Sequence, residues 1–185
     1  MTGNAVIPLN WGATREERAA HYPVDDVLPD AACDLFRAVD TTAAPESLFR
    51  WLCQLRVAPY SYDLIDNRGR RSPRTLTPGL DVLHLGDRMA RIFELVSFVP
   101  GEHVTMRLDD RLGHLMFGPV AITYAIGPGR LVAKLKVGRR GDGPLQAARR
   151  HALAWGDLVM MRRQLLTLRD LAERTGPVVS PGAAA

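Results

Sequence analysis

The chain has 185 residues, of which 46% are hydrophobic and 24% charged, a composition typical of one globular domain rather than a disordered or fibrous protein. Its longest apolar run, Leu115 to Pro128, is interrupted by Gly118 and Pro119 and is shorter than the roughly 20 residues that span a bilayer. Basic residues exceed acidic ones by 24 to 20, for a net charge of +4, which permits nucleic-acid binding without establishing it.

The N-terminal region, residues 1–31, is irregular and interrupted by prolines. Thr14 and Glu17 have the spacing of a capping box, which predicts a short helix here. The apolar stretch at the start is too brief for a secretory signal and no basic stretch precedes it. Two cysteines, Cys33 and Cys53, are too few for a disulfide framework. Together these features predict a cytoplasmic protein.

The next segments predict a strand followed by two helices. From Cys33 to Thr41 the side chains alternate between two faces, as in a strand. Pro45 suits the first turn of a helix, and the helix that it begins has an apolar face that includes Trp51. The segment Tyr60 to Asn67 predicts a short second helix, and the basic residues of 68–74 predict a turn-rich loop.

From Gly86 onward the pattern changes to a period of two, and then to a long helix. Strands separated by short connections predict an antiparallel sheet, and these are Arg88–Phe98, His103–Leu108, Val120–Ile126 and Leu131–Val137. A helix follows from about Leu145 to Arg174. It has two apolar stripes, one containing Trp155 and Val159 and the other containing Leu158 and Met161. A helix this broadly apolar is expected to be covered on more than one side.

This element order predicts an α+β domain, in which a curved antiparallel sheet wraps around the long C-terminal helix. Such an arrangement leaves room for a ligand cavity between the sheet and the helix. We therefore divide the chain into an N-terminal lead segment that packs on the domain (1–31), the domain itself (32–175) and a disordered tail (176–185).

Several blocks of residues resemble the SRPBCC superfamily, which includes START domains, birch-pollen-allergen-like (Bet v1-like) proteins and polyketide cyclases. They are Trp11-Gly12-Ala13-Thr14, Tyr22-Pro23 with Asp25, Phe36–Asp40, Pro45-Glu46, Phe49–Leu55, Tyr60–Asp63 with Asn67, and Leu80 with Gly86. The blocks span roughly residues 11 to 138 and are most similar to a bacterial subgroup. The resemblance implies the helix-grip fold and a deep hydrophobic cavity for a lipid-like or polyketide-like molecule. It implies no particular reaction.

One cluster of polar residues stands out as a candidate ligand site. Two phenols and a carboxylate, Tyr60, Tyr62 and Asp63, could orient the polar head of a ligand at the cavity mouth or act as acid and base. The alternative is structural: Asp63 binds the backbone of its loop, and the tyrosines pack with their hydroxyl groups satisfied.

Other residues are candidates for the cavity wall. The apolar and aromatic candidates are Trp51, Phe117, Tyr124, Trp155 and Val159, although their spacing is equally typical of an ordinary core. Three arginines, Arg37, Arg91 and Arg107, are expected within strands, and Arg107 is included among the cavity candidates. An arginine that points inward would mark a functional site, because its burial is costly unless it is paired. On the solvent-exposed face of the sheet, an arginine would only lay its aliphatic stem along the surface and keep its charged end in water.

The sequence gives no sign of a metal, cofactor or nucleophile site. His103 and His114 could face each other if a hairpin turned near residues 109–110, but no third ligand is apparent. Nucleophile elbows and glycine-rich phosphate loops are also missing from the sequence. We therefore assign no catalytic residue, no metal and no cofactor.

Three functions remain open at this stage. The leading hypothesis is a module that binds a hydrophobic small molecule in an internal cavity. The alternative is a polyketide cyclase or dehydratase, which needs an acid and a base, supplied by Tyr and Asp side chains, inside that cavity. A nucleic-acid binder would need a contiguous arginine face with exposed aromatic residues. We expect an apolar ligand, no nucleic acid and no insertion into a membrane, whereas the ligand's identity and the oligomeric state are not in the sequence.

Overall fold

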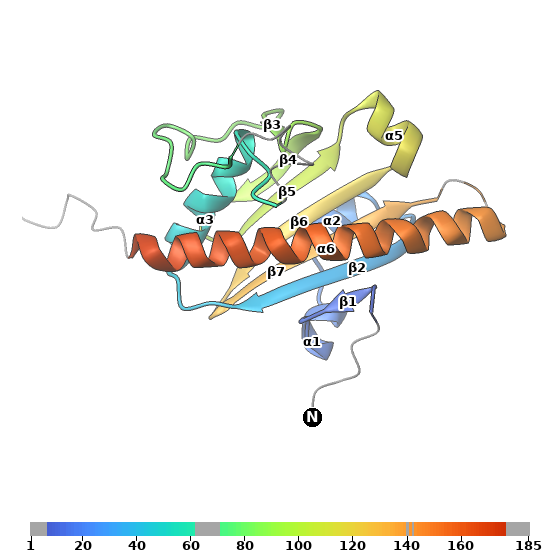
Figure 1. Cartoon of the computed structure of the whole chain (residues 1–185), viewed down its shortest axis with the longest axis horizontal. Coiled ribbons are helices and arrows are strands. Elements are labelled where there is room, and N and C mark those ends of the chain that lie inside the picture. The colour runs from blue at the N-terminus through green and yellow to red at the C-terminus, as the bar shows by residue number, and fades with distance from the viewer. Residues whose placement is uncertain (1–6, 62–70, 140, 142, 177–185) are drawn as a thin grey trace, which may run out of the picture.

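A computed structural model of the chain describes residues 7–61, 71–139, 141 and 143–176. It shows an open seven-stranded sheet with a 32-residue helix lying along one face (Figure 1). The strands are β1 (Asn10–Trp11), β2 (Ala31–Asp40), β3 (Arg88–Met89), β4 (Phe93–Val99), β5 (His103–Leu108), β6 (Val120–Gly127) and β7 (Arg130–Gly138). The helices are α1 (Arg15–Ala19), α2 (Pro23–Val27), α3 (Pro45–Cys53), α5 (Arg111–Phe117), α6 (Pro144–Thr175) and a 3₁₀ turn at Gln54–Arg56.

The strands lie in the order β1-β2-β7-β6-β5-β4-β3. Neighbours from β2 to β3 along this order are antiparallel, which confirms the predicted antiparallel arrangement of these strands. The sheet is nevertheless mixed, because β1 pairs in parallel with β2. Gly12 makes this close approach possible: it has a φ of 81°, and a Cβ there would lie 2.1 Å from the carbonyl oxygen of Ala38.

One connection differs from the sequence-based expectation. The chain forms helix α5 between β5 and β6, where the sequence predicted only a short connection and allowed a hairpin turn near residues 109–110. Asp110 caps this helix, since its carboxylate accepts a hydrogen bond from the Gly113 backbone N–H at 2.7 Å. His103 and His114 are therefore not paired across a hairpin, because one lies on a strand and the other on a helix.

The long helix α6 buries one of its two apolar stripes. Leu158, Met161 and Leu165 are all buried. Met161 and Leu165 belong to the core cluster of the sheet and α3, where truncating a leucine to alanine costs about 2–5 kcal/mol. The other stripe faces outward: Trp155 is 46% exposed and Val159 is 52% exposed. Within the described residues the helix is thus covered along one side, not on several sides as its composition suggested.

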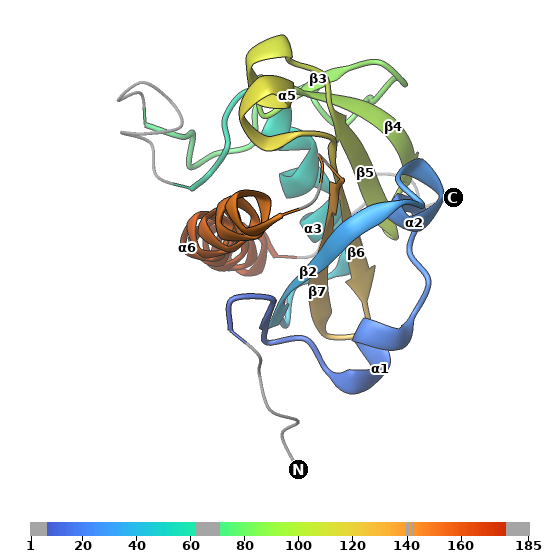
Figure 2. The same cartoon turned by 90° about the vertical axis from the view of Figure 1, so that its right-hand side faces the viewer.

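The opposite face of the sheet is covered by the N-terminal segment. Figure 2 shows α6 on one side of the sheet and α1 and α2 on the other. Tyr22 and Val24 pack there against Phe36 in a second, smaller core. The resulting order of layers, with an antiparallel sheet wrapped against a long C-terminal helix, is the helix-grip fold that the sequence resemblance implies.

Candidate functional site: a cavity between the sheet and the long helix

A cavity of about 750 Å³ lies between the inner face of the sheet, α5 and α6. This volume is within the range of roughly 300–1,000 Å³ that is usual for small-molecule sites. The strands β5, β6 and β7 supply the inner wall, because alternate side chains on each strand point to the same face. Those apolar wall residues are Met106, Leu108, Val120, Ile122, Leu135 and Val137, all of them buried.

A short chain of hydrogen bonds closes the deep end of this cavity. The hydroxyl of Tyr124 on β6 donates to Gln164 Oε1 on α6 at 2.5 Å, and the Gln164 amide donates to the Pro59 carbonyl at 2.5 Å. Burial raises the pKa of Tyr124, and the neighbouring Asp157 raises it further. The phenol therefore stays protonated. These bonds tie the segment after α3 to both walls of the cavity.

A buried ion pair also borders the cavity. Arg37 on β2 is fully buried, and its Nη2 atom lies 2.8 Å from Asp157 Oδ2 on α6. The same guanidinium donates to the carbonyl groups of Phe36 and Ala154. The contact with Asp157 is an ion pair by distance, although the carboxylate oxygen does not accept a well-aligned hydrogen bond. Burial raises the pKa of Asp157 to about 6 despite the arginine.

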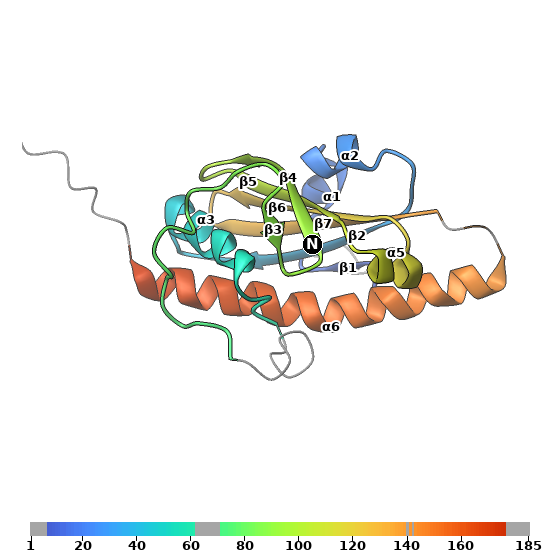
Figure 3. The same cartoon turned by 90° about the horizontal axis from the view of Figure 1, so that it is seen from above.

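Exposed side chains form the mouth of the cavity. We define the mouth by the exposed lining residues Arg91, Met116, Phe117, Arg149 and Met160. Figure 3 shows α5 beside the N-terminal half of α6. The Arg149 guanidinium donates to the Met116 carbonyl at 2.5 Å, so the two helices are joined at this point. The mouth therefore combines apolar side chains with cations.

The predicted site residues fall into four groups. Phe117 and Tyr124 line the cavity, at its mouth and its deep end. Trp51 and Tyr60 are buried in the core, where their rings meet edge to face at 5.9 Å. The Trp51 indole N–H donates to Thr175 Oγ1 at 2.9 Å, which joins α3 to the end of α6.

The remaining predicted residues lie elsewhere. Arg107 is exposed to solvent on β5 and pairs with Glu94 at 3.0 Å. Trp155 and Val159 are on the outward stripe of α6. None of these three is among the cavity-lining residues. Tyr62 and Asp63 lie outside the described residues.

Several lining residues had no place among the predicted candidates. Asp157, Gln164, Arg149 and Arg150 all lie on α6 and line the cavity. Asp157 had a visible signal, since it is the only acid between Pro144 and Arg169. Its partner could not be found from spacing, because Arg37 lies 120 positions earlier in the chain.

The structure also bears on other kinds of site. Within the described ranges, His, Cys, Asp and Glu side chains form no group of three that could hold a metal ion. In the same ranges, α6 and the other helices are too short or too polar to cross a bilayer. Cys33 and Cys53 are both free thiols.

Comparisons with known proteins identify solved structures with a similar arrangement. The sequence matched no protein-family model and no curated protein. One similar structure is the di-domain ARO/CYC StfQ from the steffimycin biosynthetic pathway, with 12% identity over 86% of this chain and a TM-score of 0.47. This chain spans 56% of that di-domain protein.

Two further structures are similar over most of their own length. Major latex-like protein 151 from Panax ginseng has 11% identity, with 78% of this chain and 97% of that chain covered and a TM-score of 0.43. A protein from Chromobacterium violaceum has 17% identity, with 76% and 97% covered and a TM-score of 0.41. Because these identities and TM-scores are low, the fold is assigned from the element order and the open sheet of this chain itself. The chain has a helix-grip fold.

Proposed function

We propose that this protein binds a hydrophobic, lipid-like or polyketide-like small molecule in the cavity between the sheet and α6. The observation that carries the proposal is the cavity itself, which is large and has predominantly apolar walls. Burial of apolar ligand surface contributes about 2.5 kcal/mol per 100 Å². A few polar groups at fixed positions, among them Gln164 and Asp157, would orient the ligand.

A glycine in the middle of α6 supports this proposal. Gly156 lines the cavity, and a Cβ at this position would meet no atom within 4 Å. Glycine inside a helix costs about 1 kcal/mol relative to alanine, and no close packing requires one here. A ligand that passes this point would use the space that the missing side chain leaves.

The proposal is tested with the purified full chain and a neutral fluorescent apolar probe, N-phenyl-1-naphthylamine. We expect the wild type to bind the probe, and Gly156→Phe to weaken binding at least about tenfold by filling the space beside Gly156 in the cavity. Ala148→Phe is the matched control, because Ala148 is exposed on the same helix and does not line the cavity. Equal binding by both variants, or no binding by the wild type, would contradict the proposal. Native mass spectrometry of the same sample would detect a retained ligand.

A second candidate function, acid–base chemistry of the cyclase or dehydratase type, is favoured by Asp157. A carboxyl group that lines a cavity with a pKa of about 6 suits proton transfer near neutral pH. Under this candidate, Asp157→Asn would abolish turnover of a polyketide-like substrate while the probe still binds. An unchanged rate in that variant would exclude Asp157 as the acid or base.

The proposal also includes a reducing, cytoplasmic setting, which the two free thiols support. Burial raises the pKa of Cys53 to about 12, so this thiol is unreactive where it stands.

A further inference from the structure

The charged groups of the cavity are unevenly balanced. Three arginines line it: Arg91 in the turn between β3 and β4, and Arg149 and Arg150 on α6. Asp157 is the only acid among the described lining residues, and it is paired with Arg37 outside this set. The cavity therefore has a net positive lining.

The charge of the three lining arginines is not neutralised by an acid, unlike the charge of Arg130. Arg130 pairs with Glu17 and Asp40. In the part of the chain that the structure describes, Arg91, Arg149 and Arg150 have no carboxylate partner. Their positive charge is thus available to a ligand.

The backbone at one of these positions is unusual. Ala90 and Arg91 are consecutive non-glycine residues in the left-handed region, with φ of 43° and 72°. Such residues cost of order 1 kcal/mol or more each and cluster at functional sites. The Ala90 N–H is held by the Leu55 carbonyl at 2.7 Å, so the turn is anchored to the segment after α3. This turn places an arginine at the cavity where a glycine would be the easier choice.

The two arginines on α6 are held in different ways. Arg149 is fixed by its bond to the Met116 carbonyl, and Arg150 is half-buried. A guanidinium has five N–H donors, so the bond to Met116 leaves Arg149 with donors for another acceptor. Guanidinium groups bind carboxylates and phosphates through paired hydrogen bonds. A cavity with low-dielectric walls strengthens that attraction.

We infer that the ligand is an amphiphile whose anionic group, a carboxylate or a phosphate, is held by Arg91, Arg149 and Arg150. Its apolar body then lies toward the deep end of the cavity, against Ile122 and Leu135. This inference rests on the proposed function and specifies its ligand class.

The test compares ligands that share one chain and differ in the head group. Dodecanoate, dodecyl phosphate and dodecanol would compete with N-phenyl-1-naphthylamine for the full chain at 0.15 M salt. We expect both anions to bind about tenfold or more tightly than the alcohol, since charge-assisted hydrogen bonds are roughly twice as strong as neutral ones. The ratio between the two anions would show which head group is preferred.

Charge-removing variants complete the test. Arg91→Asn, which tolerates a positive φ, and Arg150→Gln would each weaken dodecanoate binding about tenfold, with dodecanol binding unchanged as evidence of an intact fold. Arg111→Gln on α5 removes the same charge from an exposed residue that does not line the cavity, and it should change neither affinity. Equal affinity for alcohol and anions, or an equal loss in Arg111→Gln, would overturn the inference alone. Failure of every ligand and of the probe to bind would overturn the proposed function itself.

Discussion

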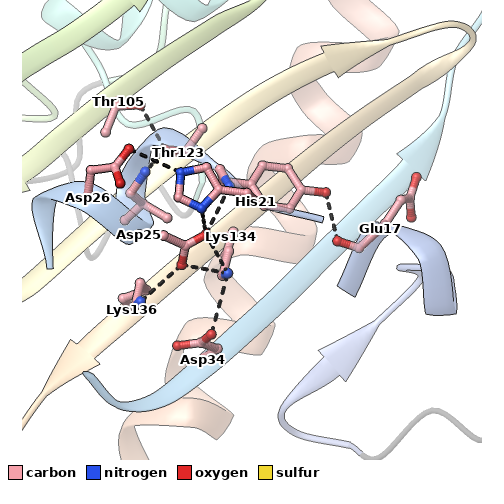
Figure 4. Close-up of polar contacts among 11 residues, drawn as sticks. Glu17, His21, Asp25, Asp26, Asp34, Thr105, Thr123, Lys134 and Lys136 are labelled. Atoms are coloured by element: carbon pink, nitrogen blue, oxygen red, sulfur yellow. Dashed lines mark hydrogen bonds and ion pairs between the residues drawn. The ribbon is translucent and has the colours of Figure 1, made fainter. Parts of the chain in front are cut away.

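The two faces of the sheet each bury an aspartate beside a cation, with opposite results. On the outer face Asp25 lies 2.7 Å from Lys134 and 2.9 Å from Lys136 (Figure 4). On the inner face Asp157 lies 2.8 Å from Arg37. The pKa of Asp25 is lowered to about 2, whereas that of Asp157 is raised to about 6.

The number of partners and the depth of burial explain this difference. Asp25 also accepts a hydrogen bond from the Tyr22 backbone N–H at 2.9 Å, and together its partners outweigh the burial that would raise its pKa. Asp157 has one cation, and burial exceeds that attraction. The outer site is thus a satisfied structural cluster, and the inner site is an incompletely satisfied pair beside a cavity, which is where functional groups are expected.

The largest expected effect comes from breaking the inner pair. Arg37→Leu would leave the carboxylate of Asp157, whose charge burial already disfavours, without its counter-charge, and should lower the free energy of unfolding by about 3–5 kcal/mol in urea denaturation. The double variant Arg37→Leu with Asp157→Leu removes both charges and should recover most of that loss. A single variant as stable as the wild type would mean that Asp157 is solvated.

Breaking the outer cluster around Asp25 should lower the free energy of unfolding somewhat less. Asp25→Ala removes the shared partner of two buried lysines, but Lys134 keeps Asp34 at 3.5 Å. We expect a loss of about 3 kcal/mol in urea denaturation, at the lower end of the range for a broken buried pair. Asp26→Ala is the control, because Asp26 is exposed and, among the described residues, forms its ion pair with the exposed His21. A loss of equal size in that control would refute the distinction.

The pH dependence of stability should have opposite signs on the two faces. Asp25 has a folded pKa below its ordinary 3.8, so its contribution is present above pH 4 and is lost as the pH falls toward 2, by roughly 2 kcal/mol. Asp157 has a raised folded pKa, so folding gains stability as the pH falls from about 6 to 4. Denaturation of Asp25→Asn and Asp157→Asn against the wild type across this range would separate the two. Parallel profiles for the two variants would contradict the assignment.

The smallest effect is a gain. Gly156→Ala should stabilise the fold by about 1 kcal/mol, since it raises the helix propensity of α6 and its methyl group meets open space. Thermal denaturation would measure it. A destabilised variant would show that Gly156 is required for packing rather than for space in the cavity.

Much of this arrangement could be predicted from local patterns. The strand His103–Leu108 was predicted with its observed bounds, and the long helix to within one residue at each end. Which of the two stripes of that helix packs against the sheet could not be predicted. Trp155 is as apolar as Leu158, and periodicity does not say which one meets the sheet. The pair of Arg37 and Asp157 depended on the same choice. Helix α5 was not predicted, for another reason. Asp110 caps this helix, but Asp109, Asp110 and Gly113 are also residues that favour a turn.

Strand β7 contributes side chains to both faces of the sheet. Lys134 and Lys136 reach Asp25 on the outer side, while the alternate residues Leu135 and Val137 line the cavity. A ligand that steadies this strand from one side steadies the lysines on the other, and linked equilibria of this kind are reciprocal. Binding of a ligand in the cavity would then change the amide hydrogen exchange rates of α2, although α2 does not line the cavity.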